Sequence, residues 1–186
     1  MRVLGIDPGS SIVGWACFDD GKLEDHGSFR GDPRFAEDWK RRRDGLMKQI
    51  SHILREKQAD VVAIEETQVV TARTDSRKPL SAQAVSGMNV NTRRTEELAG
   101  MIGMEVQVQA NKAKRQVSVV RVHPATGLAR LHLRRGASDR QISERFTLIF
   151  GKKLLVKDHH EALAAGVAMA AEQRAKMERL TGRKSA

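Results

Sequence analysis

The sequence predicts an α/β domain in which helices cover both faces of a mixed five-stranded sheet. Three short segments, at residues 3–7, 12–18 and 23–29, follow one another with tight turns between them, as in an antiparallel meander. Two later apolar runs, at residues 61–64 and 117–122, are typical of buried parallel strands. Amphipathic segments separate and follow these runs, and 186 residues are enough for one compact core.

The composition favours a partner that carries negative charge. The chain has 33 Lys and Arg against 23 Asp and Glu, and its formal net charge of +10 is expected to attract nucleic acid before membrane. The alternative is that this charge serves only solubility. The single Cys17 excludes a metal site built from cysteines and an intramolecular disulfide. The sequence has neither a signal-type N-terminus nor an apolar run of about 18 residues, so we expect no membrane span and a cytoplasmic, nucleoid-associated protein.

The first helix is expected to begin at Asp32, an N-cap residue that is followed by Pro33, and to continue to about Lys57. Apolar residues recur in this segment every three to four positions, which predicts one buried face that includes Trp39. The basic residues 40–43 are expected on the solvated face.

The middle of the chain is expected to combine a surface loop with a helix. Residues 71–79 are polar and basic without periodicity, which is typical of an exposed loop. A helix is expected from about Ser81 to Met101. In residues 105–116 valines alternate with glutamines before a basic turn, and we interpret this segment as an insertion or an additional short strand.

The last third of the chain is expected to be mainly helical. Two helical segments are predicted between residues 123 and 151, with a break at residues 134–136. A final helix is expected from about Asp158 to Met177, and its small residues would let it lie close to the sheet. We assign residues 1–178 to one domain and residues 179–186 to a basic, disordered tail.

Four carboxylates occupy positions from which they can form one site. Asp7 and Glu65 each stand at the end of an apolar strand. Asp158 and Glu161 lie three residues apart, on one face of the first turn of the last helix. Such an arrangement suits divalent cations that act on a phosphodiester, because Mg²⁺ prefers carboxylates, water and phosphate oxygens. The alternatives are structural: a turn residue that caps backbone amides for Asp7, and a capping box for Asp158 with Glu161.

Three short motifs occur in order along the chain. They are Gly5-Ile6-Asp7-Pro8-Gly9-Ser10 followed by Gly14, Ile64-Glu65 at a strand end, and Asp158-x-x-Glu161-Ala162-Leu163-Ala164 on the last helix. Together they resemble the RuvC-type Holliday-junction resolvases of the RNase H-like superfamily. The resemblance covers most of the chain and implies an RNase H-like fold and a homodimeric endonuclease that cleaves DNA at four-way junctions. It also implies that the four acids are catalytic and bind two Mg²⁺ ions per active site, for which Mn²⁺ can substitute.

The chain departs from the family pattern at three places. Glu161 stands where the family usually has Asp. His159 and His160 fall between the two acids, and we expect at most one of them to reach the site because adjacent helical residues point in different directions. No aromatic residue follows Glu65 closely, where the family has one that acts on an unstacked base.

Basic residues near the acids are the candidates for contacts with phosphates. They are Arg73, Arg77, Lys78, Arg93, Arg94, Arg130, Arg134, Arg135 and Arg140. A solvated surface role is the alternative for each of them. The sequence therefore predicts a magnesium-dependent, structure-selective endonuclease for branched DNA. The alternatives are a related nuclease for an RNA–DNA hybrid or a flap, and a non-catalytic DNA-binding module.

Overall fold

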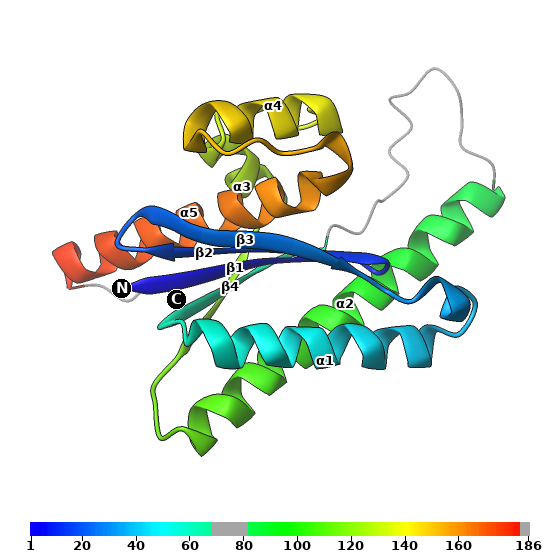
Figure 1. The fold of residues 1–186 in the computed structure, drawn as a ribbon, viewed down its shortest axis with the longest axis horizontal. Coiled ribbons are helices and arrows are strands. Elements are labelled where there is room, and N and C mark those ends of the chain that lie inside the picture. Colours follow the sequence, from blue (N-terminus) through cyan, green and yellow to red (C-terminus); the bar gives the residue numbers. More distant parts are fainter. Residues whose placement is uncertain (68–81, 183–186) are drawn as a thin grey trace.

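A mixed five-stranded sheet forms the centre of the computed structural model, which describes residues 1–67 and 82–182 (Figure 1). The strands are β1 (Arg2–Pro8), β2 (Ile12–Asp19), β3 (Lys22–Arg30), β4 (Val61–Glu65) and β5 (Ser118–Val122). Their spatial order is β3-β2-β1-β4-β5. The first three strands form an antiparallel meander, and β4 and β5 add to β1 in parallel. The predicted mixed sheet is confirmed.

Helices cover both faces of the sheet, as predicted (Figure 1). On one face lie α1 (Trp39–Lys57) and α2 (Ala82–Lys112). On the other lie α3 (Pro124–Arg130), α4 (Asp139–Phe150) and α5 (His159–Thr181). Two short 3₁₀ turns, η1 (Pro33–Phe35) and η2 (Val156–Asp158), precede α1 and α5.

Alternation of side chains along the strands produces two separate cores. Leu4 and Ile6 of β1 point toward α1 and α2, whereas Val3 of the same strand points toward α3, α4 and α5. Phe18 and Phe146 are the largest fully buried side chains in the core beside α5. Strands β1 and β4 are buried on both faces, which explains why their sequences are continuous apolar runs.

Helix α5 lies unusually close to the sheet because two strand residues that face it are glycines. A Cβ atom on Gly5 of β1 would lie 2.1 Å from the carbonyl oxygen of Ala164, and one on Gly14 of β2 would lie 2.1 Å from that of His160. Real Cβ atoms do not approach backbone this closely, so only glycine fits at either position. The two glycines therefore fix the depth at which α5 packs on β1 and β2.

The start of the first helix differs from the prediction. Asp32 does cap a helical turn and accepts a hydrogen bond from the backbone N–H of Arg34, but this turn is the short η1. Helix α1 begins only at Trp39, where Asp38 is the N-cap residue and accepts from the N–H of Arg41. The sequence has two cap signals, and the second one starts the long helix.

The first residues of α1 agree only in part with the prediction. Trp39 is half-buried against the core beneath α1 and α2, in agreement with the prediction. Arg42 is not on the solvated face: it is buried, donates to the carbonyl oxygen of Ala36, and lies over the Trp39 ring.

Two further boundaries were predicted incorrectly. Residues 105–116 are not a strand or an insertion, because α2 continues to Lys112. The valines and glutamines of this segment fit a helix, in which Val106 is buried and Val108 is exposed. Helix α5 continues to Thr181, three residues into the predicted tail, and residues 183–186 lie outside the described part of the chain.

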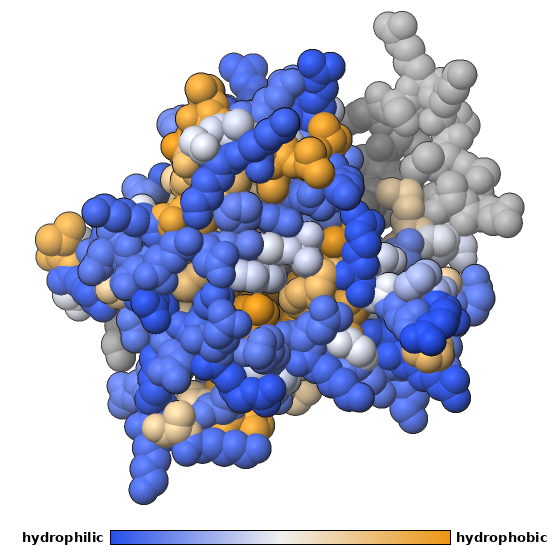
Figure 2. Space-filling model, in the orientation of Figure 1, coloured by the Kyte–Doolittle hydropathy of each residue, from blue (hydrophilic) through white to orange (hydrophobic). Residues whose placement is uncertain are grey.

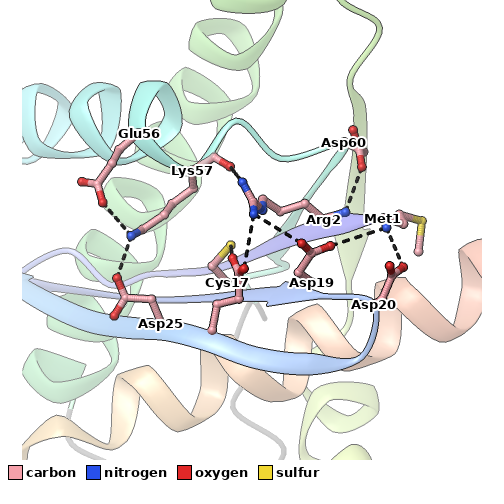
Figure 3. A network of polar contacts seen from close by, with 10 residues as sticks. Met1, Arg2, Cys17, Asp19, Asp20, Asp25, Glu56, Lys57 and Asp60 are labelled. Atoms are coloured by element: carbon pink, nitrogen blue, oxygen red, sulfur yellow. Dashed lines mark hydrogen bonds and ion pairs between the residues drawn. The ribbon is translucent and has the colours of Figure 1, made fainter.

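A network of charged side chains joins the beginning of β1 to α1 and β3 (Figure 3). The guanidinium of Arg2 lies 3.3 Å from the carboxylate of Asp19, and its backbone N–H donates to Asp60 at 2.8 Å. The ammonium of Lys57 at the end of α1 lies 2.6 Å from Asp25 of β3. These pairs are partly exposed, so we expect each to contribute little to stability.

Cys17 lies beneath this network as a buried free thiol. Burial, together with the nearby Glu24 carboxylate, raises the pKa of the Cys17 thiol to about 11. The thiol is therefore protonated at neutral pH, which makes it a poor nucleophile.

The surface is largely hydrophilic on the face drawn in Figure 2. None of the helices in the described ranges is both long enough and apolar enough to cross a membrane.

The contact between Gly5 and α5 predicts a large effect of one added methyl group. We expect Gly5→Ala to lower the free energy of unfolding by about 3 kcal/mol or more, because the helix backbone must move away. Gly45 provides the matched control, since it is an exposed residue within α1 that has no atom near its Cβ position. Gly45→Ala is expected to raise stability by about 0.5–1 kcal/mol. Urea unfolding of both variants checks this, and equal effects would contradict the proposed tight contact.

Candidate active site

The sheet places Asp7 and Glu65 side by side. Strands β1 and β4 run in parallel with Ile6 opposite Ile64, so the residue after each of them stands at the same edge of the sheet. The two carboxyl groups share a hydrogen bond. Asp7 is only 6% exposed and Glu65 is half-buried. Two acids that are far apart in the sequence are thereby brought together.

This contact changes the protonation of Glu65. Burial is the main cause, and the charge and hydrogen bond of Asp7 add to it, so that the pKa of Glu65 lies well above its ordinary value of 4.5. Two like charges in a poorly solvated place cannot both ionise at low cost. A cation beside the pair would favour the ionised form of Glu65.

The first turn of α5 brings a histidine to the same pair. Nδ1 of His160 lies 2.5 Å from Oδ2 of Asp7. Burial lowers the pKa of His160, but the hydrogen bond and charge of Asp7, with Asp139 further away, outweigh it, so the net direction is upward. His159 points elsewhere: its Nδ1 lies 3.1 Å from the carbonyl oxygen of Val156. One of the two histidines reaches the site, as expected.

Glu161 points toward β3 rather than toward Asp7. Its Oε2 lies 2.5 Å from Nδ1 of His26, and its Oε1 accepts a hydrogen bond from the Ser28 hydroxyl at 2.9 Å. The side chain is 8% exposed. His26 packs edge-on against the Phe146 ring at 5.0 Å between centroids, which holds the imidazole in place.

Asp158 precedes the first residue of α5 and is half-buried at the end of η2. Its side chain makes no capping hydrogen bond, and Glu161 is bonded to β3, so the alternative of a capping box at this helix is wrong. The capping box in this part of the chain is at α4, between Ser138 and Gln141. Helix capping therefore does not explain why acidic residues occupy positions 158 and 161.

The four predicted acids are thus only partly assembled. Asp7 and Glu65 are in contact, whereas Glu161 is bound to the residues of β3. Within residues 1–67 and 82–182, no three His, Cys, Asp or Glu side chains are arranged so that they could hold a metal ion as they stand. The donor chemistry of the Asp7–Glu65 pair nevertheless fits a divalent cation, because a buried and a half-buried carboxyl group are in contact at one place, beside His160.

Two polar residues of the site carried no signal in the sequence. His26 and Ser28 are two residues apart and face the same side of β3. Polar residues on one side of an edge strand are common, so this pattern alone does not indicate a functional site. Their importance follows only from their contacts with Glu161.

The predicted phosphate-binding residues lie in three places. Arg73, Arg77 and Lys78 lie outside the described residues. Arg93 and Arg94 belong to α2, where the guanidinium of Arg94 lies over the Trp39 ring at 5.7 Å. The others end α3, lie between α3 and α4, or begin α4, on the opposite face of the sheet: Arg130, Arg134, Arg135 and Arg140. Arg140 is paired with Glu144 at 2.7 Å.

The buried pair predicts that Glu65→Gln stabilises the protein in the absence of divalent cations. The substitution removes a carboxylate that is disfavoured beside Asp7, so we expect the free energy of unfolding at pH 8 to rise by about 1–2 kcal/mol. Because the pKa of Glu65 is raised to about 10, the folded protein keeps this proton at both pH values, whereas the unfolded chain loses it above about pH 4.5. The cost of Glu65 to stability therefore grows as the pH rises, and the gain from Glu65→Gln should shrink at pH 5. Urea unfolding in EDTA at both pH values measures it.

Glu66→Gln is the matched control, because Glu66 is the next residue and is exposed. It should change stability by less than about 0.5 kcal/mol at either pH. A Glu65→Gln variant that is no more stable than Glu66→Gln would contradict the buried like-charge contact.

Comparison with known proteins places the fold. No protein-family model and no curated protein matches the sequence. Among solved structures, the chain is similar to RuvC of Thermus thermophilus, with 21% sequence identity and a TM-score of 0.59 over 95% of this chain and 96% of that one.

Two further structures give a similar result. RuvC of T. thermophilus in complex with a Holliday junction substrate matches with 20% identity and a TM-score of 0.59, again over 95% of this chain and 96% of that chain. The yeast mitochondrial Holliday junction resolvase Ydc2 matches with 14% identity and a TM-score of 0.50, over 96% of this chain and 82% of that chain. The chain therefore has the RNase H-like fold of the RuvC-type Holliday-junction resolvases.

Proposed function

We propose that this protein is a magnesium-dependent, structure-selective endonuclease that resolves Holliday junctions or other branched DNA by hydrolysis of phosphodiester bonds. The observation that carries the proposal is the contact of Asp7 with Glu65 at the ends of two adjacent parallel strands, on a fold shared with junction resolvases. A buried pair of acids that is unfavourable without a cation is the kind of group that functional sites contain.

Each residue of the candidate site has a separate role in this proposal. Asp7 and Glu65 would hold a divalent cation, and Asp158 and Glu161, as the sequence predicts, would complete sites for two Mg²⁺ or Mn²⁺ ions. Bound cations of this kind neutralise the phosphate charge and lower the pKa of a water molecule. His160 orients the Asp7 carboxylate, to which its Nδ1 is hydrogen-bonded.

Glu161 is bonded to His26 and Ser28 of β3, so it would have to release these partners to take part in such a site.

Charge supports DNA as the substrate. The net charge of +10 favours a polyanion, and those predicted phosphate-binding arginines that belong to the described residues lie on both faces of the sheet. One of the similar structures, RuvC of T. thermophilus, is in complex with a Holliday junction substrate, and we infer the same class of substrate here. A four-way junction has two-fold symmetry, which fits a homodimer with one active site for each of two strands.

The proposal predicts that Asp7→Asn abolishes cleavage and leaves binding intact. We expect at least a 10³-fold loss in the rate of cleavage of a synthetic four-way junction in Mg²⁺, since several kcal/mol of transition-state stabilisation depend on the cation site. Affinity for the junction should be unchanged or higher, because a buried negative charge is removed. The substrates are the junction, a linear duplex of matching sequence and an RNA–DNA hybrid, each with Mg²⁺ and with chelator.

The exposed Glu66→Gln variant is the control and should cleave as the wild type does. Paired nicks confined to the junction and dependent on Mg²⁺ support the resolvase. Cleavage of the hybrid alone would favour the related nuclease, and binding of the junction without any cleavage would favour the non-catalytic module. Full activity of Asp7→Asn would refute the metal-dependent mechanism.

A further inference from the structure

A groove lies at the end of the sheet opposite to Asp7 and Glu65. It has a volume of about 620 Å³ and lies between the last turns of α1 and α2 and the beginning of β5. Its floor is apolar and consists of Leu54, Ala59, Val62, Val106, Ala110 and Val117. This size is within the range of sites that bind small molecules or peptide side chains.

Basic side chains form the rim of this groove. Arg55, Lys112 and Arg115 line it, and none of its lining residues in the described chain is acidic. Arg55 and Lys112 are exposed. Arg115 has a structural role as well, because its guanidinium donates to the carbonyl oxygen of Gln58 at 2.7 Å and so joins the ends of the two helices. Arg115 also lies 3.6 Å from the Asp60 carboxylate, so the groove presents an apolar floor beside the positive charges of Arg55 and Lys112.

We propose that this groove, which we call the α1–α2 groove, binds a short acidic peptide segment of another protein through one or two apolar side chains. The apolar floor would take the side chains, and Arg55 and Lys112 would pair with carboxylates on either side of them. An apolar anchor with charged neighbours is a common way for a peptide to bind with specificity.

Two other occupants fit the groove less well. The backbone of duplex DNA would contact the basic rim, but its charged phosphates make no favourable contact with a floor of aliphatic side chains. A second copy of this chain has 33 Lys and Arg against 23 Asp and Glu, so its surface offers fewer acidic than basic side chains to pair with a positive rim. An acidic segment with apolar side chains satisfies both the charge and the floor.

The place of the groove leaves the active site open. Ala59 and Val62 lie at the beginning of β4, and Glu65 lies at its end, so a peptide in the groove approaches the sheet from the edge opposite to the acids. Figure 1 shows the ends of α1 and α2 on the side of the sheet where β4 begins. A partner bound there can hold the enzyme while DNA occupies the other end.

Fluorescence anisotropy with a labelled synthetic peptide tests the proposal. The probe is a ten-residue peptide with Leu and Phe at its centre and two Asp or Glu residues on each side. Its two controls replace the apolar pair by Ser or the acidic residues by Lys. We expect binding of the first peptide only, and an affinity at least about tenfold weaker for the Arg55→Glu/Lys112→Glu double variant.

A second double variant controls for net charge. Lys40→Glu/Lys48→Glu changes the charge by the same amount at exposed positions of α1 away from the groove, and it should alter peptide affinity by less than about twofold. Thermal unfolding confirms that both variants fold. The proposal is overturned if the probe binds no better than its Ser control, or if the two double variants weaken it equally.

Two further measurements distinguish the other occupants. Sedimentation of the groove variant would reveal a lost dimer, which would assign the groove to a second copy of the chain. A loss of junction affinity greater than that of the control variant would assign it to DNA. Either outcome overturns the peptide proposal, and neither depends on whether the protein cleaves DNA.

Discussion

The close approach of α5 to the sheet is the constraint on which the rest of the site depends. Gly5 and Gly14 let the backbone of this helix contact β1 and β2, and any side chain at either position would push it away. At this depth the first turn of α5 reaches Asp7 on one side, through His160, and β3 on the other, through Glu161. A shift of the helix would separate both pairs together, so the packing of two glycines controls the geometry of four polar side chains.

Electrostatics explains why these side chains are arranged in pairs. Asp7 and Glu161 are both nearly buried, and each has a histidine nitrogen at 2.5 Å. Glu65 has the Asp7 carboxyl group as its neighbour, and burial together with that neighbour raises the pKa of Glu65. A protein that needed only stability would replace this acid by a neutral residue. The cost of this acid to stability supports the proposal that the pair binds a divalent cation.

Much of this could be predicted from the sequence, because it depends on local pattern. Apolar runs predicted the strands and placed Asp7 and Glu65 at strand ends, and the two acids lie together because β4 pairs with β1 in parallel. The partners of Glu161 could not be predicted, because they depend on how deeply α5 packs and on which residues of β3 face it. The length of α2 was missed for a similar reason: the segment after Met101 has the composition of a half-exposed helix and of a strand, and its packing against α1 selects the helix.

The central claim is that Asp7 and Glu65 form a site for a divalent cation. Binding of Mn²⁺, measured from the electron paramagnetic resonance signal of the free ion without DNA, tests it most directly. We expect the wild type and Glu66→Gln to remove Mn²⁺ from solution with equal affinity, and Asp7→Asn and Glu65→Gln to bind it at least about tenfold more weakly. Equal binding by all four proteins would contradict the claim and leave the two acids as a structural pair.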